Sequence, residues 1–348
     1  MRRKRRIWLF ALAMVMAVLV GAITLLMQPP RDPMFRGQPE SEWIKGIVYH
    51  MQLSDSESQA QAQRWRELGP DGLRILENGL RPAPGCAYRK LYRRYARKLP
   101  QFMVRLLPSP SMDKLAGTRM NVLSLLSRMG QEGRSAWRAV ARALEDENDG
   151  VRQIAIIYFT RPEDKTAFLN HMPARDKQEL LPHFLRALRD GSDGMLRNNA
   201  ALALGYYPEK APEVAPTLVV ALRDTEPWVR LTASSSLNQV DATAAKKAGV
   251  VTVLAALVTN ANDQVAARAA HALRGCTNDA DRAVAVLIQA LHSTNSNVGC
   301  NAVWSLEWEF PGHADTIIPE LKKAAERKDN VGGYARSAIK NLESRRPR

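Results

Sequence analysis

A recurring pair of residues, an aliphatic residue followed four positions later by alanine, organises the chain from residue 181 to residue 342. The pair returns at intervals of 33, 36, 33 and 33 residues, at Leu196/Ala200, Val229/Ala233, Val265/Ala269, Val298/Ala302 and Val331/Ala335. In a typical unit, an apolar run (216–222), a polar turn (224–227) and a second apolar run (228–237) predict two helices. Such a period is typical of units that bury their apolar faces only by stacking on one another. The sequence therefore predicts an all-α solenoid.

One unit is similar to a HEAT repeat of the bacterial kind, through Leu218–Leu222, Arg223, Asp224, Trp228, Val229, Arg230, Ala233 and Leu237. This resemblance implies a right-handed α-α superhelix of antiparallel helix pairs. HEAT units carry a Pro near the start of the first helix, an Asp in the turn and an Arg in the second helix. The matches are Pro182, Pro216, Pro319, Asp146/Arg152, Asp190/Arg197 and Asp224/Arg230. The last three units have Ala266, Gly299 and Gly332 in place of the Arg, so we expect no continuous Asp–Arg ladder there.

An uncharged stretch of 21 residues, Ile7–Met27, lies near the start of the chain. At ~1.5 Å per residue it spans the ~30 Å core of a bilayer, which predicts one N-terminal transmembrane helix. The basic residues 2–6 precede it, so the positive-inside rule places the N-terminus in the cytoplasm and exports the repeats to the periplasm. The alternative is a signal peptide that is cleaved to release a secreted protein, although Leu25–Met27 are bulky for a cleavage site.

The repeat and the uncharged stretch together set the predicted boundaries of the chain's segments. We predict a cytoplasmic basic tail at 1–6, a transmembrane helix at 7–27, a linker and N-terminal capping helix at 28–57, and a basic tail at 343–348. The solenoid occupies 58–342, with a basic insertion at about 81–118. Phe35–Ile44 is similar to the entry segment of membrane-anchored bacterial HEAT-repeat proteins of uncharacterised function. Trp43, Ile44 and Ile47 form the apolar face expected of a cap.

The insertion contains a basic amphipathic helix, Tyr88–Leu99. Its apolar stripe is Tyr88, Leu91, Tyr92, Tyr95 and Leu99, and its cations are Arg89, Lys90, Arg93, Arg94, Arg97 and Lys98. Three interpretations remain open. The helix contacts anionic lipid headgroups, it clamps an acidic partner, or its stripe docks on a neighbouring repeat and its cations face solvent.

The net charge of +15 does not favour nucleic acid as a partner. Twelve of the positive charges lie in two clusters, residues 2–6 and 89–105, so the repeats themselves are close to neutral. Three cysteines with no short spacing predict neither a disulfide framework nor a zinc site. No motif for catalysis, a cofactor or a metal is present in the sequence.

The helical period predicts which residues point away from the core. Six positions after each aliphatic anchor, the second helix faces the inner, concave surface of a HEAT-like stack. Large amphipathic side chains gather there only toward the C-terminus, and the binding candidates are Arg268, His271, Asn301, Trp304, Trp308 and Tyr334. Small residues at Ala266, Gly299 and Gly332 are expected to widen the groove. The alternative is that the two Trp side chains cover the seam between units.

These observations favour a non-enzymatic, membrane-anchored scaffold whose concave face binds a protein partner. No cofactor is expected. Alternatives are an enzyme or enzyme accessory of the HEAT-like lyase type, and nucleic-acid or polyanion binding through the basic helix.

Overall fold

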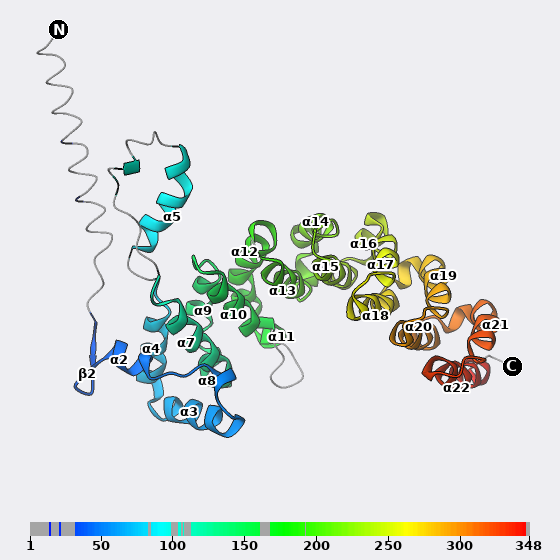
Figure 1. Ribbon diagram of the computed structural model, residues 1–348, viewed down its shortest axis with the longest axis horizontal. Helices are drawn as coiled ribbons and strands as arrows, with labels where there is room; N and C mark the ends of the chain where they lie inside the picture. Colours follow the sequence, from blue (N-terminus) through cyan, green and yellow to red (C-terminus); the bar gives the residue numbers. More distant parts are fainter. Residues whose placement is uncertain are drawn as a thin grey trace, which may run out of the picture. The chain divides into compact units, whose positions relative to one another are not determined.

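The computed structural model describes residues 32–82, 85–98, 113–160, 168–191 and 193–345, together with Met14, Gly21, Val104, Arg105 and Leu107. The chain forms two compact units, residues 1–163 and 164–348, and each is described by itself (Figure 1). The predicted transmembrane helix lies outside the described residues except for Met14 and Gly21, and so do both predicted basic tails apart from 343–345. Within the described part of the chain, no helix has the length and apolar character needed to span a bilayer.

The N-terminal unit opens with a small hairpin that the sequence did not predict. Strands β1 (Met34–Phe35) and β2 (Gln38–Pro39) pair antiparallel, with Met34 opposite Pro39. Arg36 and Gly37 both have positive φ angles, 48° and 82°, as a tight two-residue hairpin turn requires. The predicted linker therefore ends in ordered structure.

The predicted capping helix is α2 (Glu40–Lys45), which packs against α4 (Gly69–Gly79) and α7 (Ala116–Arg128). Ile44 and Ile47 are buried. The Trp43 indole donates a hydrogen bond to the Phe35 carbonyl at 3.2 Å, which ties the helix to the hairpin.

The other elements of the N-terminal unit are η1 (His50–Gln52), α3 (Asp55–Glu67), α5 (Cys86–Tyr95), η2 (Ala96–Lys98), α8 (Gln131–Arg134), α9 (Trp137–Ala143) and α10 (Asp149–Thr160). Helix α3 begins with a capping box in which Ser54 and Glu57 bond each other's backbone amides. The sequence 69–72 reads as a loop, yet α4 already begins at Gly69. The left-handed conformation of Gly69 (φ +60°) reverses the chain within one residue, so no longer loop is needed.

The C-terminal unit consists of stacked helix pairs, as predicted (Figure 1). The first helices are α12 (Ala174–Asp190), α14 (Ala211–Ala221), α17 (Val250–Val258), α19 (Ala280–Ala290) and α21 (Ala314–Ala324). The second helices are α13 (Gly194–Leu204), α15 (Pro227–Val240), α18 (Asp263–Ala272), α20 (Ser296–Glu309) and α22 (Asn330–Ser344). Neighbouring second helices contact one another, from α13 through to α22.

The short helix α11 (Phe168–His171) precedes the first pair. The elements that connect the pairs are η3 (Pro208–Lys210), α16 (Ala242–Ala248), η4 (Leu273–Gly275), η5 (Thr277–Asp279) and η6 (Pro311–His313). Helix α16 explains the one interval of 36 residues, because it is an extra helix between α15 and α17. The prolines Pro182, Pro216 and Pro319 lie inside their helices rather than at the start, so each first helix continues through its proline.

The core of the C-terminal unit is built from the repeated pairs. The aliphatic anchors of the second helices are at most 1% exposed, and the alanines four positions later are fully buried. This confirms that the repeated pair faces the stack.

Candidate protein-binding surface

Two tryptophans one helical turn apart on α20 are exposed to solvent. Trp304 is 42% exposed and Trp308 is 50% exposed, and their ring centroids lie 6.3 Å apart. Large aromatic side chains usually bury most of their surface, so exposed neighbouring tryptophans on a helix mark a candidate binding surface.

Side chains of the neighbouring helices stack on these two rings. The His271 imidazole of α18 lies 6.1 Å from the Trp304 ring at an interplanar angle of 18°. The Arg274 guanidinium lies 5.0 Å from the Trp304 centroid, and that of Arg345, at the end of α22, lies 4.5 Å from the Trp308 centroid. We call these five residues the tryptophan cluster. It crosses three consecutive helix pairs.

The structure brings only part of the predicted set together. His271, Trp304 and Trp308 belong to the cluster, whereas Arg268 lies over the Trp228 ring at 5.7 Å. Of the remaining two candidates, Asn301 donates to the carbonyl of Asn297 in its own helix, and Tyr334 is 55% exposed on α22.

Two members of the cluster were missed from the sequence. Arg274 is one turn beyond His271. It lies in the 3-10 helix η4, so the period of a regular α-helix does not predict where its side chain points. Arg345 lies beyond the last repeated pair, so the repeat pattern does not predict which way it faces.

The expectation that small residues widen a groove is wrong. Ala266, Gly299 and Gly332 are buried, and the two glycines lie against the next unit and against the turn of their own unit, respectively. A Cβ on Gly299 would lie 2.7 Å from Val331, and one on Gly332 would lie 2.0 Å from the Arg327 carbonyl oxygen. These positions are small because the chain packs closely against them.

The surroundings of the cluster are positively charged. Burial lowers the pKa of His271, and the charges of Arg274 and Arg268 lower it further. Arg274 also donates to Glu309 at 2.6 Å, which neutralises the carboxylate on this part of α20.

Comparison with known proteins identifies the C-terminal unit. The HEAT repeat family matches residues 181–274 and 250–343. Residues 181–343 are HEAT repeats. This confirms the coarse prediction, an all-α HEAT-like repeat protein.

Several solved structures are similar to the chain at low identity. An engineered protein is 20% identical, with 78% of this chain and 74% of that chain covered, at a TM-score of 0.48. The archaeal HEAT-like repeats protein from Thermococcus onnurineus NA1 is 14% identical, with 68% and 99% covered, at a TM-score of 0.42. No curated protein matches the sequence.

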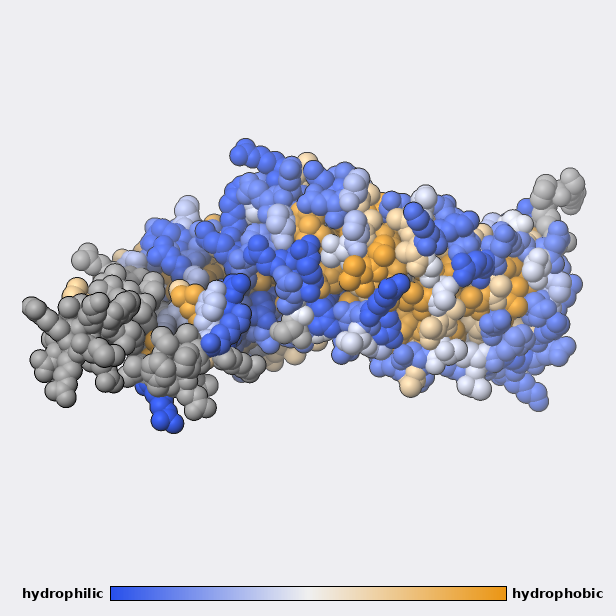
Figure 2. Space-filling view, turned by 90° about the horizontal axis from the view of Figure 1, so that it is seen from above, coloured by the Kyte–Doolittle hydropathy of each residue, from blue (hydrophilic) through white to orange (hydrophobic). Residues whose placement is uncertain are grey.

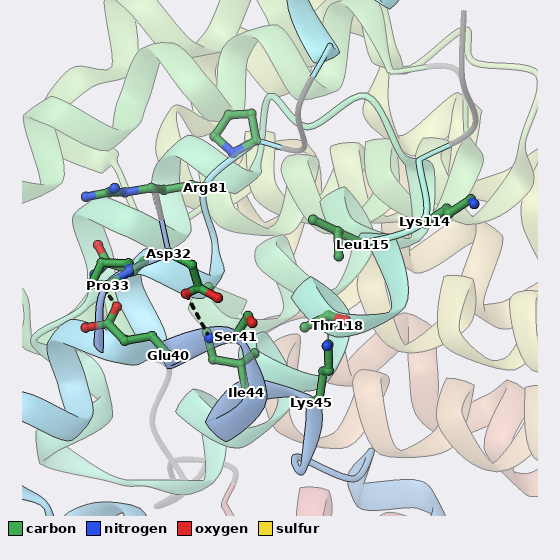
Figure 3. A pocket seen from close by; sticks show the side chains of 13 residues that line it. Asp32, Pro33, Glu40, Ser41, Ile44, Lys45, Arg81, Lys114, Leu115 and Thr118 are labelled. Carbon is green, nitrogen blue, oxygen red and sulfur yellow. Dashed lines mark hydrogen bonds between the residues drawn. The ribbon is translucent and has the colours of Figure 1, made fainter. Parts of the chain in front are cut away.

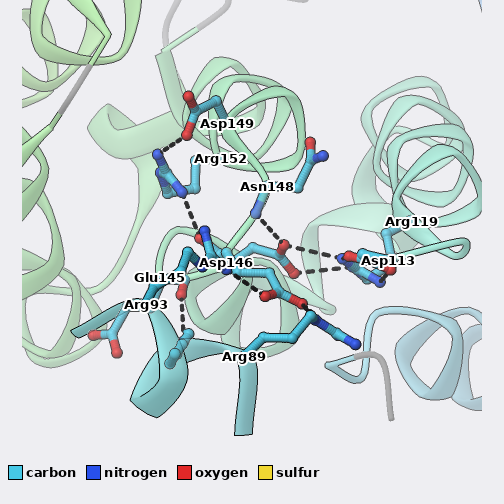
Figure 4. Close-up of polar contacts among 11 residues, drawn as sticks. Arg89, Arg93, Asp113, Arg119, Glu145, Asp146, Asn148, Asp149 and Arg152 are labelled. Atoms are coloured by element: carbon cyan, nitrogen blue, oxygen red, sulfur yellow. Dashed lines mark hydrogen bonds and ion pairs between the residues drawn. The ribbon is translucent and has the colours of Figure 1, made fainter. Parts of the chain in front are cut away.

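An Asp and an Arg of the HEAT pattern join two neighbouring turns at Arg197 and Asp224. Arg197 donates to Gly191 in its own turn and binds both carboxylate oxygens of Asp224 in the next turn, at 2.7 and 2.8 Å. Arg119 pairs with Asp146 in the same way in the N-terminal unit (Figure 4). Further along, Asn262, Asn295 and Asp329 cap the second helices.

The apolar stripe of the basic helix, α5, is only partly buried. Tyr88 of the apolar stripe is buried, but Leu91 is 51% exposed and Tyr95 is 44% exposed. The interpretation in which the cations face solvent is wrong for Arg89, which is buried because it pairs with the buried carboxylate of Glu147, which also binds Arg93 (Figure 4).

The remaining cations of α5 are divided between contact and solvent. Lys90 donates to the Glu145 carbonyl at 3.0 Å. Arg94 and Lys98 are exposed beside the Tyr95 ring, at 5.6 and 5.9 Å from its centroid. Arg97 is described only by its backbone.

A cavity of about 420 Å³ lies in the N-terminal unit between the hairpin, α2, α4 and the start of α7 (Figure 3). Its buried acid, Glu40, accepts hydrogen bonds from Arg74 and Asn78. The other acid of the lining, Asp32, accepts a hydrogen bond from the Ser41 backbone amide at 3.2 Å.

The structure gives no sign of a metal site among the residues it describes: no three His, Cys, Asp or Glu side chains converge. Cys86, Cys276 and Cys300 are free thiols, and burial raises the pKa of each.

Proposed function

We propose that this protein is a membrane-anchored scaffold whose HEAT repeats bind another protein through the tryptophan cluster. The exposure of Trp304 and Trp308 on stacked second helices carries the proposal. Trp and Arg dominate the energetics of protein interfaces, because they bury large areas and still bond at their polar edges. The anchor is the uncharged stretch 7–27, and the repeats lie outside the cytoplasmic membrane or, after signal cleavage, are secreted.

A binding role accounts for the cluster better than a catalytic one. The titratable groups at the cluster are the His271 imidazole, which contacts Arg274, and the neighbouring Glu309 carboxylate, which accepts from Arg274. Catalysis of the HEAT-like lyase type needs an acid or base that is free to transfer a proton. We therefore propose no enzymatic activity and no cofactor.

Apolar residues on the first helices supply a control surface. Figure 2 views the molecule from above Figure 1, the side of the first helices in the C-terminal unit, where apolar residues show among hydrophilic ones. Val220 of α14, one of these first helices, is 74% exposed.

The test places a photo-crosslinking amino acid at Trp308 or at Val220 in cells, followed by binding measurements with the purified captured protein. We expect a product specific to position 308, and we expect Trp304→Ala to weaken binding of that protein at least about tenfold while Val220→Ala does not. The proposal fails if both positions capture the same products. A fall of many degrees in the unfolding midpoint of Trp304→Ala would assign Trp304 to packing instead.

A further inference from the structure

Each tryptophan on the second helices from α15 to α20 is covered by an arginine of a neighbouring pair. The three contacts are Arg268 over Trp228, Arg274 over Trp304 and Arg345 over Trp308, at 5.7, 5.0 and 4.5 Å from guanidinium carbon to ring centroid. Each of these arginine–tryptophan contacts joins two neighbouring helix pairs, and the contact holds the arginine in place.

Stacking leaves the edge of a guanidinium open. The N–H groups lie in its plane, so a stacked arginine still offers the two parallel donors that a carboxylate binds. Glu309 occupies this edge of Arg274. Arg268 is exposed and has no ion pair among the described residues, and Arg345 uses one donor on the Glu307 carbonyl at 3.4 Å.

The carboxylates of these second helices do not compete for the open edges. Glu307 is buried and accepts from Asn341, Glu343 lies 3.7 Å from Lys322, and Asp263 accepts from Asn295. The exposed Lys340 adds a positive charge on α22. Asp263 keeps its negative charge because Asn295 is neutral, and in the described part of α18, α20 and α22 the cations left open to a carboxylate from outside the protein are Arg268 and Lys340.

The surface combines open guanidinium edges with two indole rings that are about half exposed, 42% at Trp304 and 50% at Trp308. Resting on the proposed function, we propose that the segment recognised here is an acidic peptide. Its carboxylates bind Arg268 and Arg345, and an apolar side chain between them packs on Trp304 and Trp308. Helices pack about 8–10 Å apart, so two helix spacings separate the arginines by at least about 16 Å. An extended segment of about six residues or more spans that distance.

The test uses the full-length protein in detergent and fluorescence anisotropy of three labelled 12-residue peptides. Each carries a central Leu and Phe, flanked by Asp and Glu, by Asn and Gln, or by Lys. We expect the acidic peptide to bind about tenfold more tightly than the neutral one, and Arg268→Gln with Arg345→Gln to remove that difference. Arg223→Gln, an exposed arginine on the turn after α14, is the matched control and should bind as the unmodified protein does.

Three results overturn the inference. They are equal binding of the acidic and neutral peptides, an acidic preference that survives in the double variant, and tighter binding of a 12-nucleotide RNA than of the acidic peptide. None of these depends on the cross-linking at Trp308. A discrete captured protein together with equal peptide binding would retain the scaffold function and reject only the acidic segment.

Discussion

Asp224 joins two neighbouring HEAT units through one side chain, which gives the array a residue-level dependence on pH. Burial raises its pKa, but the hydrogen bonds from Arg197 and from the backbone amide of Glu226 outweigh burial and hold the pKa below its ordinary value. A carboxyl group with a lowered pKa in the folded state stabilises the fold above its unfolded pKa of about 4, and that stabilisation is lost as the pH falls further.

We expect Asp224→Asn to lower the free energy of unfolding at pH 7 by about 1–3 kcal/mol, because Arg197 loses its ionised partner. The variant should also lose less stability than the unmodified protein between pH 5 and about pH 2. Urea unfolding at several pH values measures both effects. Parallel acid curves for the two proteins would contradict the assignment.

Two adjacent glycines on α22 provide a matched pair. A Cβ on Gly332 meets the Arg327 carbonyl, whereas nothing lies within 4 Å of one on Gly333. We expect Gly332→Ala to destabilise the protein by about 1–3 kcal/mol through overpacking. Gly333→Ala should stabilise it by about 0.5–1 kcal/mol, since alanine loses less backbone entropy in a helix. Thermal unfolding midpoints that move in the same direction would reject close packing at Gly332.

At the scale of elements, Tyr88 and Arg89 are on a buried side of α5, and the other side faces solvent. Glu147 binds Arg89 and Arg93, so the opposite side carries Leu91, Arg94 and Tyr95. Exposed cations beside an exposed aromatic and an aliphatic residue suit an anionic membrane surface, and contact with anionic lipid remains a prediction.

We expect full-length protein in nanodiscs to show slower amide hydrogen exchange over 90–98 with anionic lipid than with zwitterionic lipid. The cause is that Arg94 and Lys98 approach the headgroups, each contributing on the order of 1 kcal/mol. Arg94→Gln with Lys98→Gln should abolish the difference, while Arg223→Gln should preserve it. Identical hydrogen exchange in both lipids would reject contact with anionic lipid and would mean that these cations face solvent.

The helix pairs were predictable because the sequence repeats the anchors that pack them. Val265 and Val298 recur at a fixed interval, and that interval is set by the size of one stacked unit. Partners across units were not predictable in this way. Arg89 belongs to a cationic run in the sequence, but whether it faces solvent depends on Glu147, which lies 58 residues away. The clash at Gly332 likewise depends on the course of the turn that precedes α22.

At the scale of the whole molecule, the distribution of charge predicts its topology. Residues 2–6 are basic and precede the uncharged stretch 7–27, so the positive-inside rule predicts that the repeats lie on the far side of the membrane. We expect a C-terminal tag on the full-length protein to be cleaved by protease added to spheroplasts. Permeabilised cells control for cleavage of a protected tag. A tag that is cleaved only after permeabilisation would place the repeats in the cytoplasm and make nucleic acid a partner to test.

The stacking of His271, Trp304, Trp308 and Arg345 across three successive helix pairs has a mechanical consequence. Each HEAT unit touches only its neighbours, so bending the C-terminal unit changes the spacing between adjacent second helices. That spacing sets how closely the imidazole and the guanidinium lie on the indole rings. We therefore expect the fluorescence emission of these two tryptophans to change with the curvature of the repeats, whether a partner or an applied force bends them.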